Sequence, residues 1–208
     1  MLNFFMYKKP EPIDGFYAAP INTRMMAWAL DLMVLIYFVM EISSFIFSIY
    51  FPDGYVYSKV MKQALGEHPE LAKGGNMAIM QYIYHKYPAE FRASIEQIVF
   101  SYMTQMSLIG LYVIIMHKRF GKTVGKFLVG IKVVDKTTKD TITYGQAIIR
   151  YLGLIIAALP LGLGVFWGAF NQKKRCWHDY FSDTIVVVDP NSWYSKFIAK
   201  LKAYFNIK

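Results

Sequence analysis

Residues 22–51 read NTRMMAWALDLMVLIYFVMEISSFIFSIYF, a long apolar run that nevertheless contains charged side chains. A helix needs about 20 mostly apolar residues to cross a hydrocarbon core of about 30 Å, and residues 25–51 meet that requirement. Arg24, Asp31 and Glu41 lie at the start of this run or inside it. A carboxylate at membrane depth costs on the order of 2.5 to 3.5 kcal/mol, so it is expected to face protein or water. The run therefore predicts a membrane helix that carries a polar functional site.

The composition of the chain is that of a small multi-span membrane protein. Of its 208 residues, 55% are hydrophobic and 18% are charged, which is apolar for a soluble domain. The formal net charge of +9 comes from basic residues beside the apolar runs, a pattern that orients membrane helices and attracts anionic lipid. We expect one membrane domain over residues 1–208, in contact with the bilayer and anionic lipid head groups. Nucleic acid is not an expected partner.

A second apolar run, residues 95–116, predicts a second membrane helix and contains Gln105. The polar segment between the two runs, residues 52–94, has nearly balanced charge and two short helical patterns at 55–65 and 77–86. Balanced charge is typical of a translocated loop, so we expect this segment to form an extracytoplasmic insertion.

The connection after the second run, residues 117–147, carries seven lysines and arginines but only two aspartates. The positive-inside bias predicts that this connection is cytoplasmic. Both termini then lie in the cytoplasm, and the expected location is the cell inner membrane.

A third apolar element, residues 147–170, is interrupted by Pro160, Gly162 and Gly164. Proline breaks or kinks a helix, and the two glycines favour a turn. Two arms of about ten residues would each reach roughly 15 Å, or half the bilayer. We therefore favour a re-entrant helical hairpin, with a single kinked span as the alternative. The expected fold class is mainly α, a polytopic helical membrane protein.

Three β-branched runs, at residues 130–134, 141–144 and 184–188, predict a small cytoplasmic sheet, because three strands are more stable than two. Pairing of the first and last runs would require the apolar element between them to enter and leave the membrane on one face. This requirement favours the hairpin over the kinked span.

The C-terminal residues 190–208 predict a basic amphipathic helix. Its apolar stripe is flanked by Lys196, Lys200 and Lys202, as in helices that lie on an anionic leaflet. The alternative is a helix packed on the small sheet.

Several of these features occur together in one known family. The chain resembles the RDD family of small bacterial integral membrane proteins in Arg24, Asp31, FGKTVGKFLVGIKVVD at 120–135, Arg150 and WHDYFSDTIVV at 177–187. The resemblance covers residues 16–188, with residues 52–94 as an insertion.

The resemblance implies that Arg24 and Asp31 are the family's arginine and first aspartate, and that Asp179 is its second aspartate. His178 and Arg150 are supporting polar residues. The family is suspected of transport. Asp183 departs from the family pattern, which has a small residue before the final threonine.

Sharper motifs are not supported. In residues 121–123, GKT resembles the end of a P-loop, but the first glycine of that motif would fall on Met116. Gly121 and Gly125 are expected instead to let a short helix approach the membrane helices closely. Cys176 and His178 have a spacing that no common zinc site uses, so we expect no metal and no cofactor. No nucleophile has an identifiable base, so we do not expect an enzyme.

Three classes of function remain. In a transporter, Asp31, Glu41 and Gln105 would bind a cation or proton, and so few spans would require a homo-oligomer. In a structural or accessory protein, the charges would only hold helices together. In a lipid-binding protein, Arg24, Arg150 and the basic run 173–175 would hold an anionic head group.

Side-chain direction predicts how the charges pair. Helical side chains lean toward the N-terminus, so Arg24 points away from Asp31 although the two share a helix face. We therefore predict that Asp31 pairs with Arg150 and that Arg24 pairs with Asp179.

Overall fold

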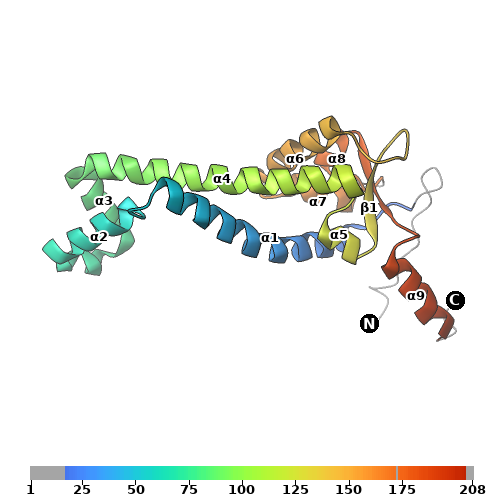
Figure 1. Cartoon of the computed structure of the whole chain (residues 1–208), viewed down its shortest axis with the longest axis horizontal. Helices are drawn as coiled ribbons and strands as arrows, with labels where there is room; N and C mark the ends of the chain where they lie inside the picture. Colours follow the sequence, from blue (N-terminus) through green and yellow to red (C-terminus); the bar gives the residue numbers. More distant parts are fainter. Residues whose placement is uncertain (1–16, 172, 205–208) are drawn as a thin grey trace. The chain divides into compact units, whose positions relative to one another are not determined.

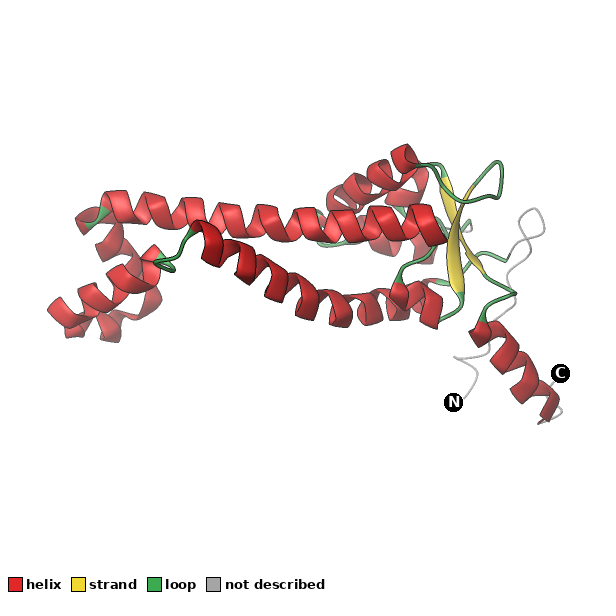
Figure 2. Cartoon of the chain, in the orientation of Figure 1, coloured by secondary structure: helices red, strands yellow, loops and turns green. Residues whose placement is uncertain are grey.

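The computed structural model describes residues 17–171 and 173–204, and 74% of these described residues are helical. Helices dominate Figure 2, in which the only strands drawn in the described part form one small sheet. The predicted mainly α fold is therefore confirmed. The chain divides into two compact units, one made of residues up to Leu35 together with those from Gly110 onward, the other of Ile36–Ile109. The predicted insertion 52–94 lies within the second unit.

Two helices are long and apolar enough to cross a membrane, α1 (Ile21–Tyr50) and α4 (Pro88–Phe120). Large apolar side chains along both are exposed, including Met33 and Phe45 on α1 and Met103 and Leu111 on α4. Such exposure suits lipid contact, because a helix that is apolar all round belongs in a membrane or a core. The two predicted membrane helices are confirmed.

The third apolar element is broken into α6 (Tyr144–Ala158) and α7 (Leu163–Phe170), which bend by 97°. The turn follows Pro160, and both Leu161 and Gly162 adopt positive φ. Glycine adopts this conformation without strain, whereas Leu161 does so at the tip of the turn with 94% of its surface exposed. The break predicted from proline and glycine is thus present.

The sheet has two antiparallel strands, β1 (Ile131–Asp135) and β2 (Thr184–Val188). Ile131 lies opposite Val188, and Asp135 opposite Thr184. A single membrane-spanning segment between β1 and β2 would put the two strands on opposite sides of the membrane. Because the strands pair, the chain between them must enter and leave the membrane on the same side. The sheet therefore favours the re-entrant hairpin over a third span.

The prediction of a third strand at residues 141–144 is wrong. Thr143 instead begins α6, where its hydroxyl accepts from the Gln146 N–H and the Gln146 side chain accepts from the Thr143 N–H. This reciprocal pair is a capping box, whose T-x-x-Q spacing is visible in the sequence. The free edge of β2 is covered by residues 17–19, with a bridge between Ala18 and Val187.

Short helices complete the first unit: α5 (Val124–Leu128), α8 (Trp177–Phe181) and α9 (Trp193–Tyr204). Figure 1 shows α6, α7 and α8 grouped together beside the sheet. The predicted C-terminal helix is present as α9, while residues 205–208 lie outside the described part. Tyr194 of α9 packs against Gly130 at the start of β1, and Trp193 and Phe197 are exposed.

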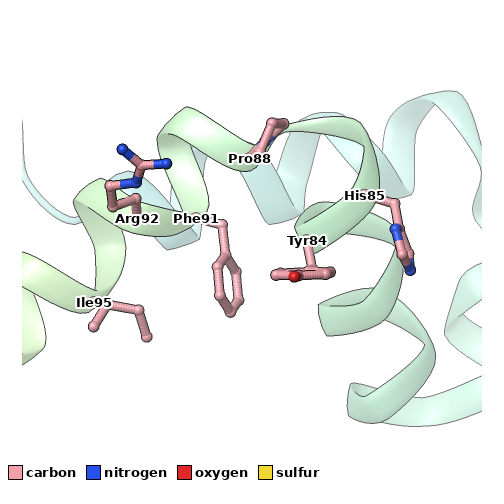
Figure 3. A pocket seen from close by; sticks show the side chains of 6 residues that line it. All are labelled: Tyr84, His85, Pro88, Phe91, Arg92 and Ile95. Carbon is pink, nitrogen blue, oxygen red and sulfur yellow. The ribbon is translucent and has the colours of Figure 1, made fainter.

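In the second unit, α2 (Val56–Glu67), a 3-10 helix (η2, Pro69–Gly74) and α3 (Gly75–Lys86) surround a small core. This core contains Val60, Ala64, Ile79 and Ile83. The two helical patterns predicted here are confirmed. An open hollow lies between α3 and the start of α4, and Figure 3 shows the rings of Tyr84 and Phe91 next to each other within it.

Candidate functional site

The centre of the first unit is the fully buried carboxylate of Asp179, which two arginines approach. Its Oδ2 lies 2.7 Å from Nη1 of Arg24 on α1, and its Oδ1 lies 2.5 Å from Nη1 of Arg150 on α6. Oδ1 nevertheless accepts no well-directed hydrogen bond, so its contact with Arg150 is an ion pair by distance alone. The backbone N–H of Cys176 also donates to Oδ2. The predicted pairing of Arg24 with Asp179 is confirmed.

Arg24 connects α1 to the sheet as well as to α8. Its Nε donates to the carbonyl of Ala19 at 3.0 Å, and its Nη2 lies 3.4 Å from the carbonyl of Val186 on β2. Its side chain is 10% exposed. An arginine in the first turn of a helix opposes the helix dipole, and the buried carboxylate of Asp179 provides the anion that offsets this cost.

Arg150 links α6 to β2 through Thr184, whose hydroxyl it contacts at 2.5 Å. Thr184 is fully buried and also contacts the Ser182 hydroxyl. The three elements that carry Arg24, Arg150 and Asp179 are therefore held together by one charge-assisted network.

The predicted pairing of Asp31 with Arg150 is wrong. The carboxylate of Asp31 instead accepts from the Tyr112 hydroxyl at 3.0 Å, the Thr123 hydroxyl at 2.5 Å and the Gly125 N–H at 2.8 Å. Both carboxylate oxygens are used, and α1, α4 and α5 are joined through one side chain. Neutral donors suffice for a buried carboxylate when several hydrogen bonds reach it.

Gly125 allows these hydrogen bonds to form. A Cβ at this position would lie 2.0 Å from the carbonyl oxygen of Ala27 and 2.9 Å from Cγ of Asp31. The backbone of α5 thus touches the backbone of α1, as the predicted close approach of a short helix requires. Tyr112 completes the contact, because its hydroxyl also accepts from the Val124 N–H. The roles of Tyr112, Thr123 and Thr184 were not predicted, since lone hydroxyl residues carry no distinctive spacing.

Three further polar residues lie in this region: His117 on α4, Lys126 on α5 and His178 on α8. His117 is 3% exposed, and the ammonium of Lys126 lies 3.4 Å from the Thr123 hydroxyl. Burial lowers the pKa of Lys126 to about 8, and the charge of Arg150 acts in the same direction. We refer to Arg24, Asp31, His117, Lys126, Arg150, His178 and Asp179 as the buried polar cluster.

Two pKa shifts follow from the cluster. Burial by itself raises the pKa of Asp179, but the charges of Arg150 and Arg24 lower it well below its ordinary range. Burial lowers the pKa of His178 to about 3, although the charge of Asp179 opposes this shift. At neutral pH the carboxylate is therefore charged and the imidazole is neutral.

One group of possible metal ligands lies in the described residues, formed by Cys176, His178 and Asp179, whose ligand atoms are within 4.8 Å of one another. Two guanidiniums already occupy the carboxylate. Burial also raises the pKa of the Cys176 thiol, which disfavours the thiolate that a metal binds. The group therefore fits an ion-pair network better than a metal centre.

Glu41 and Gln105, two predicted site residues, lie in the second unit. Glu41 is exposed on α1, and Gln105 is partly buried on α4. Their predicted role as ion ligands stays a prediction.

The basic run 173–175 does not form one clamp. Arg175 is buried, donates to the carbonyl of Asp179, and lies over the ring of Tyr180. It also pairs with Asp183, which adopts φ 49°. Asp is among the non-glycine residues enriched in this left-handed backbone, so Asp183 is compatible with the position before Thr184.

Comparison with protein families matches residues 18–183 to the RDD family. Among curated proteins, the chain is similar to "Uncharacterized protein RP437" of Rickettsia prowazekii (strain Madrid E), with 26% identity over 171 residues that cover 79% of this chain and 92% of the relative. No solved structure matches. The matched region contains all seven residues of the buried polar cluster.

Proposed function

Because the chain belongs to the RDD family and has two helices able to cross a membrane, we propose that it is a multi-pass transporter of a small solute or ion. The observation that carries this proposal is the buried polar cluster beside the broken helices α6 and α7. Charged residues buried among membrane helices mark ion and substrate pathways, and transporters build their sites at broken helices. Arg150 lies on α6 itself, only 5% exposed.

The polar contacts divide the cluster into two roles. Asp31 holds α5 against α1 and α4 with both oxygens occupied, so we assign it to the framework and not to the ligand. Asp179 holds both arginines. The ligand site is then formed by the other polar atoms of the cluster. Binding of a cation or proton by Asp31 is less well supported, because both of its oxygens already accept hydrogen bonds.

A structural or accessory role is the second candidate, and the same contacts favour it. Both aspartates join elements distant in sequence, which a purely architectural cluster would also do. The two candidates differ in one measurable property, because only a transporter moves a solute across a sealed membrane.

We further propose the orientation and the assembly. Because the connection 117–147 is basic, we propose that it lies in the cytoplasm together with both termini, and that the protein resides in the cell inner membrane. Glu41 is exposed on a membrane helix, which is costly against lipid, and a second copy of the chain would cover it in a homo-oligomer. Exposed Trp193 and Phe197 with Lys196 on α9 suit contact with anionic lipid head groups.

Flux in proteoliposomes tests the proposal. Vesicles containing a trapped pH-sensitive dye would receive gradients of sodium, potassium or phosphate in turn. We expect the wild-type protein to dissipate at least one gradient faster than protein-free vesicles do, and Arg150→Gln to abolish the difference. Arg92→Gln, an equal charge change at an exposed residue of the second unit, is the matched control. Absence of flux for every gradient would favour the accessory role.

A further inference from the structure

The C-terminal half of α1 carries a row of polar side chains on a face that the rest of the described chain leaves exposed. Tyr37, Glu41, Ser44 and Ser48 are all exposed, and they follow one another at helical spacing. At about 100° per residue, the four positions fall within about 60° of one another around the helix axis. They therefore form one stripe, which we call the α1 polar stripe.

The buried face of this half of α1 is a different one. Val39, Ser43 and Phe47 are buried at successive turns, and the centre of their face lies about 130° around the helix from the α1 polar stripe. Phe47 stacks on Tyr55, with ring centroids 4.2 Å apart. The helix thus packs against its own chain with one face and presents the stripe on another.

The polar atoms of the stripe have few partners within the chain. The Ser48 hydroxyl donates to the Phe45 carbonyl at 2.8 Å. The side chains of Tyr37, Glu41 and Ser44 make no hydrogen bond or ion pair with the described residues. Glu41 lies about 15 Å along the helix from the end of the apolar run, which is half of a hydrocarbon core of about 30 Å. A carboxyl group at that depth faces protein or water and not lipid, so the stripe is suited to contact with another chain.

Ser44 and Ser48 mark the point where a second helix can approach most closely. Small residues four positions apart let the backbones of two membrane helices come together, and serine hydroxyls form hydrogen bonds across such contacts. The longer side chains of Tyr37 and Glu41 precede the two serines on the same stripe. Helices that cross at the serines diverge there, which leaves room for longer side chains.

The α1 polar stripe is complementary to itself. Glu41 has oxygens that accept hydrogen bonds, and hydroxyls that donate them lie one turn before it, on Tyr37, and one turn after it, on Ser44. All copies of a membrane protein have the same orientation, so the α1 helices of two copies are parallel. About a two-fold axis each residue then lies opposite its own copy and near residues one turn away. A second copy of the chain therefore brings the donors that Glu41 requires.

We propose that the α1 polar stripe is the interface between two copies of this chain, whose α1 helices cross at Ser44 and Ser48. The carboxyl group of Glu41 accepts from the hydroxyls of the partner's Tyr37 and the partner's Ser44, and the partner's Glu41 is bound in the same way in return. Both copies contribute to this polar contact, which neither can form alone. The inference rests on the homo-oligomer put forward with the proposed function and names the surface that forms it.

Cysteine cross-linking in vesicles that contain only the purified full chain tests the geometry. Under copper phenanthroline, Ser44→Cys is expected to form disulfide-linked dimers at least about tenfold faster than Ile42→Cys, because a disulfide requires Cβ atoms within about 4.5 Å. Ile42 is the matched control, since it is 45% exposed and points about 160° away from Ser44 at nearly the same depth. The wild type, whose single cysteine is buried, gives the background rate. Equal rates at positions 42 and 44 would overturn the proposal.

Energy transfer between copies labelled at Lys62→Cys, an exposed position on α2, measures association as the protein is diluted in lipid. Glu41→Leu is expected to weaken association at least about tenfold, because it removes hydrogen bonds from both copies. Glu41→Gln retains an oxygen that accepts and is expected to weaken association less. Circular dichroism is expected to be unchanged in both variants, since the side chain is exposed.

Ser44→Leu tests the close approach of the helices and is also expected to weaken association at least about tenfold. Ser107→Leu, the same change at an exposed serine of α4, is the matched control and is expected to associate as the wild type does. Unchanged association in Glu41→Leu or in Ser44→Leu would overturn the proposed interface.

Association and transport are measured separately, so the two proposals can fail independently. Cross-linking at Ser44→Cys together with an absence of flux in vesicles would overturn the transport proposal and leave the interface intact. Flux by a wild-type protein that shows no energy transfer between copies would overturn the interface and leave the transport proposal intact.

Discussion

The guanidinium of Arg24 donates to Oδ2 of Asp179 at 2.7 Å, across 155 residues of chain. This contact ties the start of α1 to α8, and Arg150 brings α6 to the same carboxylate. One buried side chain thus fixes three helices.

Asp179→Asn is expected to lower the free energy of unfolding by about 3 to 5 kcal/mol, because it leaves two buried guanidiniums without a counter-charge. Denaturant unfolding in mild detergent measures the loss. Asp183→Asn is the control, since its carboxylate side chain is 58% exposed and surface ion pairs contribute at most about 1 kcal/mol. Similar losses in the two variants would contradict the central role of Asp179.

Asp31→Asn is expected to lower the free energy of unfolding by about 1 to 3 kcal/mol. The amide nitrogen, itself a donor, would replace a carboxylate oxygen and would face a group that also donates. Adding Arg150→Gln should not rescue it. The two residues have separate partners, so their effects on unfolding should add to within about 0.5 kcal/mol. Recovery of stability in the double variant would restore the direct pair that the structure lacks.

Gly125→Ala is expected to destabilise the first unit by several kcal/mol or to prevent folding, since its Cβ would overlap the Ala27 carbonyl oxygen. Gly66→Ala on α2 meets no atom within 4 Å and should stabilise by up to about 1 kcal/mol through helix propensity. Thermal unfolding of both variants tests the close approach of α5. A mild effect at Gly125 would mean that α5 does not touch α1.

Stability is expected to fall as the pH drops from 7 to 5. The pKa of His178 is about 3 in the folded state and about 6.5 in the unfolded state. Between these values the unfolded chain binds more protons, so stability rises with pH there, by at most about 1.4 kcal/mol per unit. When the free energy of unfolding is measured in amine buffers, its slope against pH should be shallower for His178→Gln than for the wild type. His85→Gln, at an exposed histidine of α3, should keep the wild-type slope.

Labelling by a membrane-impermeant maleimide tests the hairpin. Cysteines introduced at Lys136 and Lys196 should react from the same side of the membrane, and one introduced at Lys62 from the other. The native Cys176 is buried, and burial raises the pKa of its thiol, so it should not interfere. Reaction of positions 136 and 196 from opposite sides would establish a third span.

The sequence by itself determined the local features of the fold. The length and hydropathy of the two apolar runs predicted α1 and α4, and Pro160 with Gly162 predicted the break between α6 and α7. Each depends on the chemistry of neighbouring residues, which tertiary contacts do not alter. The pairing of Arg24 with Asp179 was also predictable, because a basic residue in the first turn of a membrane helix requires an anion.

Only the tertiary structure decided which partners Asp31 has and what covers the edge of β2. Several donors could satisfy a buried carboxylate, and the choice depends on which backbone can come within 3 Å of it. The absence of a side chain at Gly125 allows α5 to do so, whereas Arg150 is held by Asp179 and Thr184. At β2, residues 17–19 occupy the edge through a bridge between Ala18 and Val187, and Thr143 and Gln146 form a helix cap in place of a third strand.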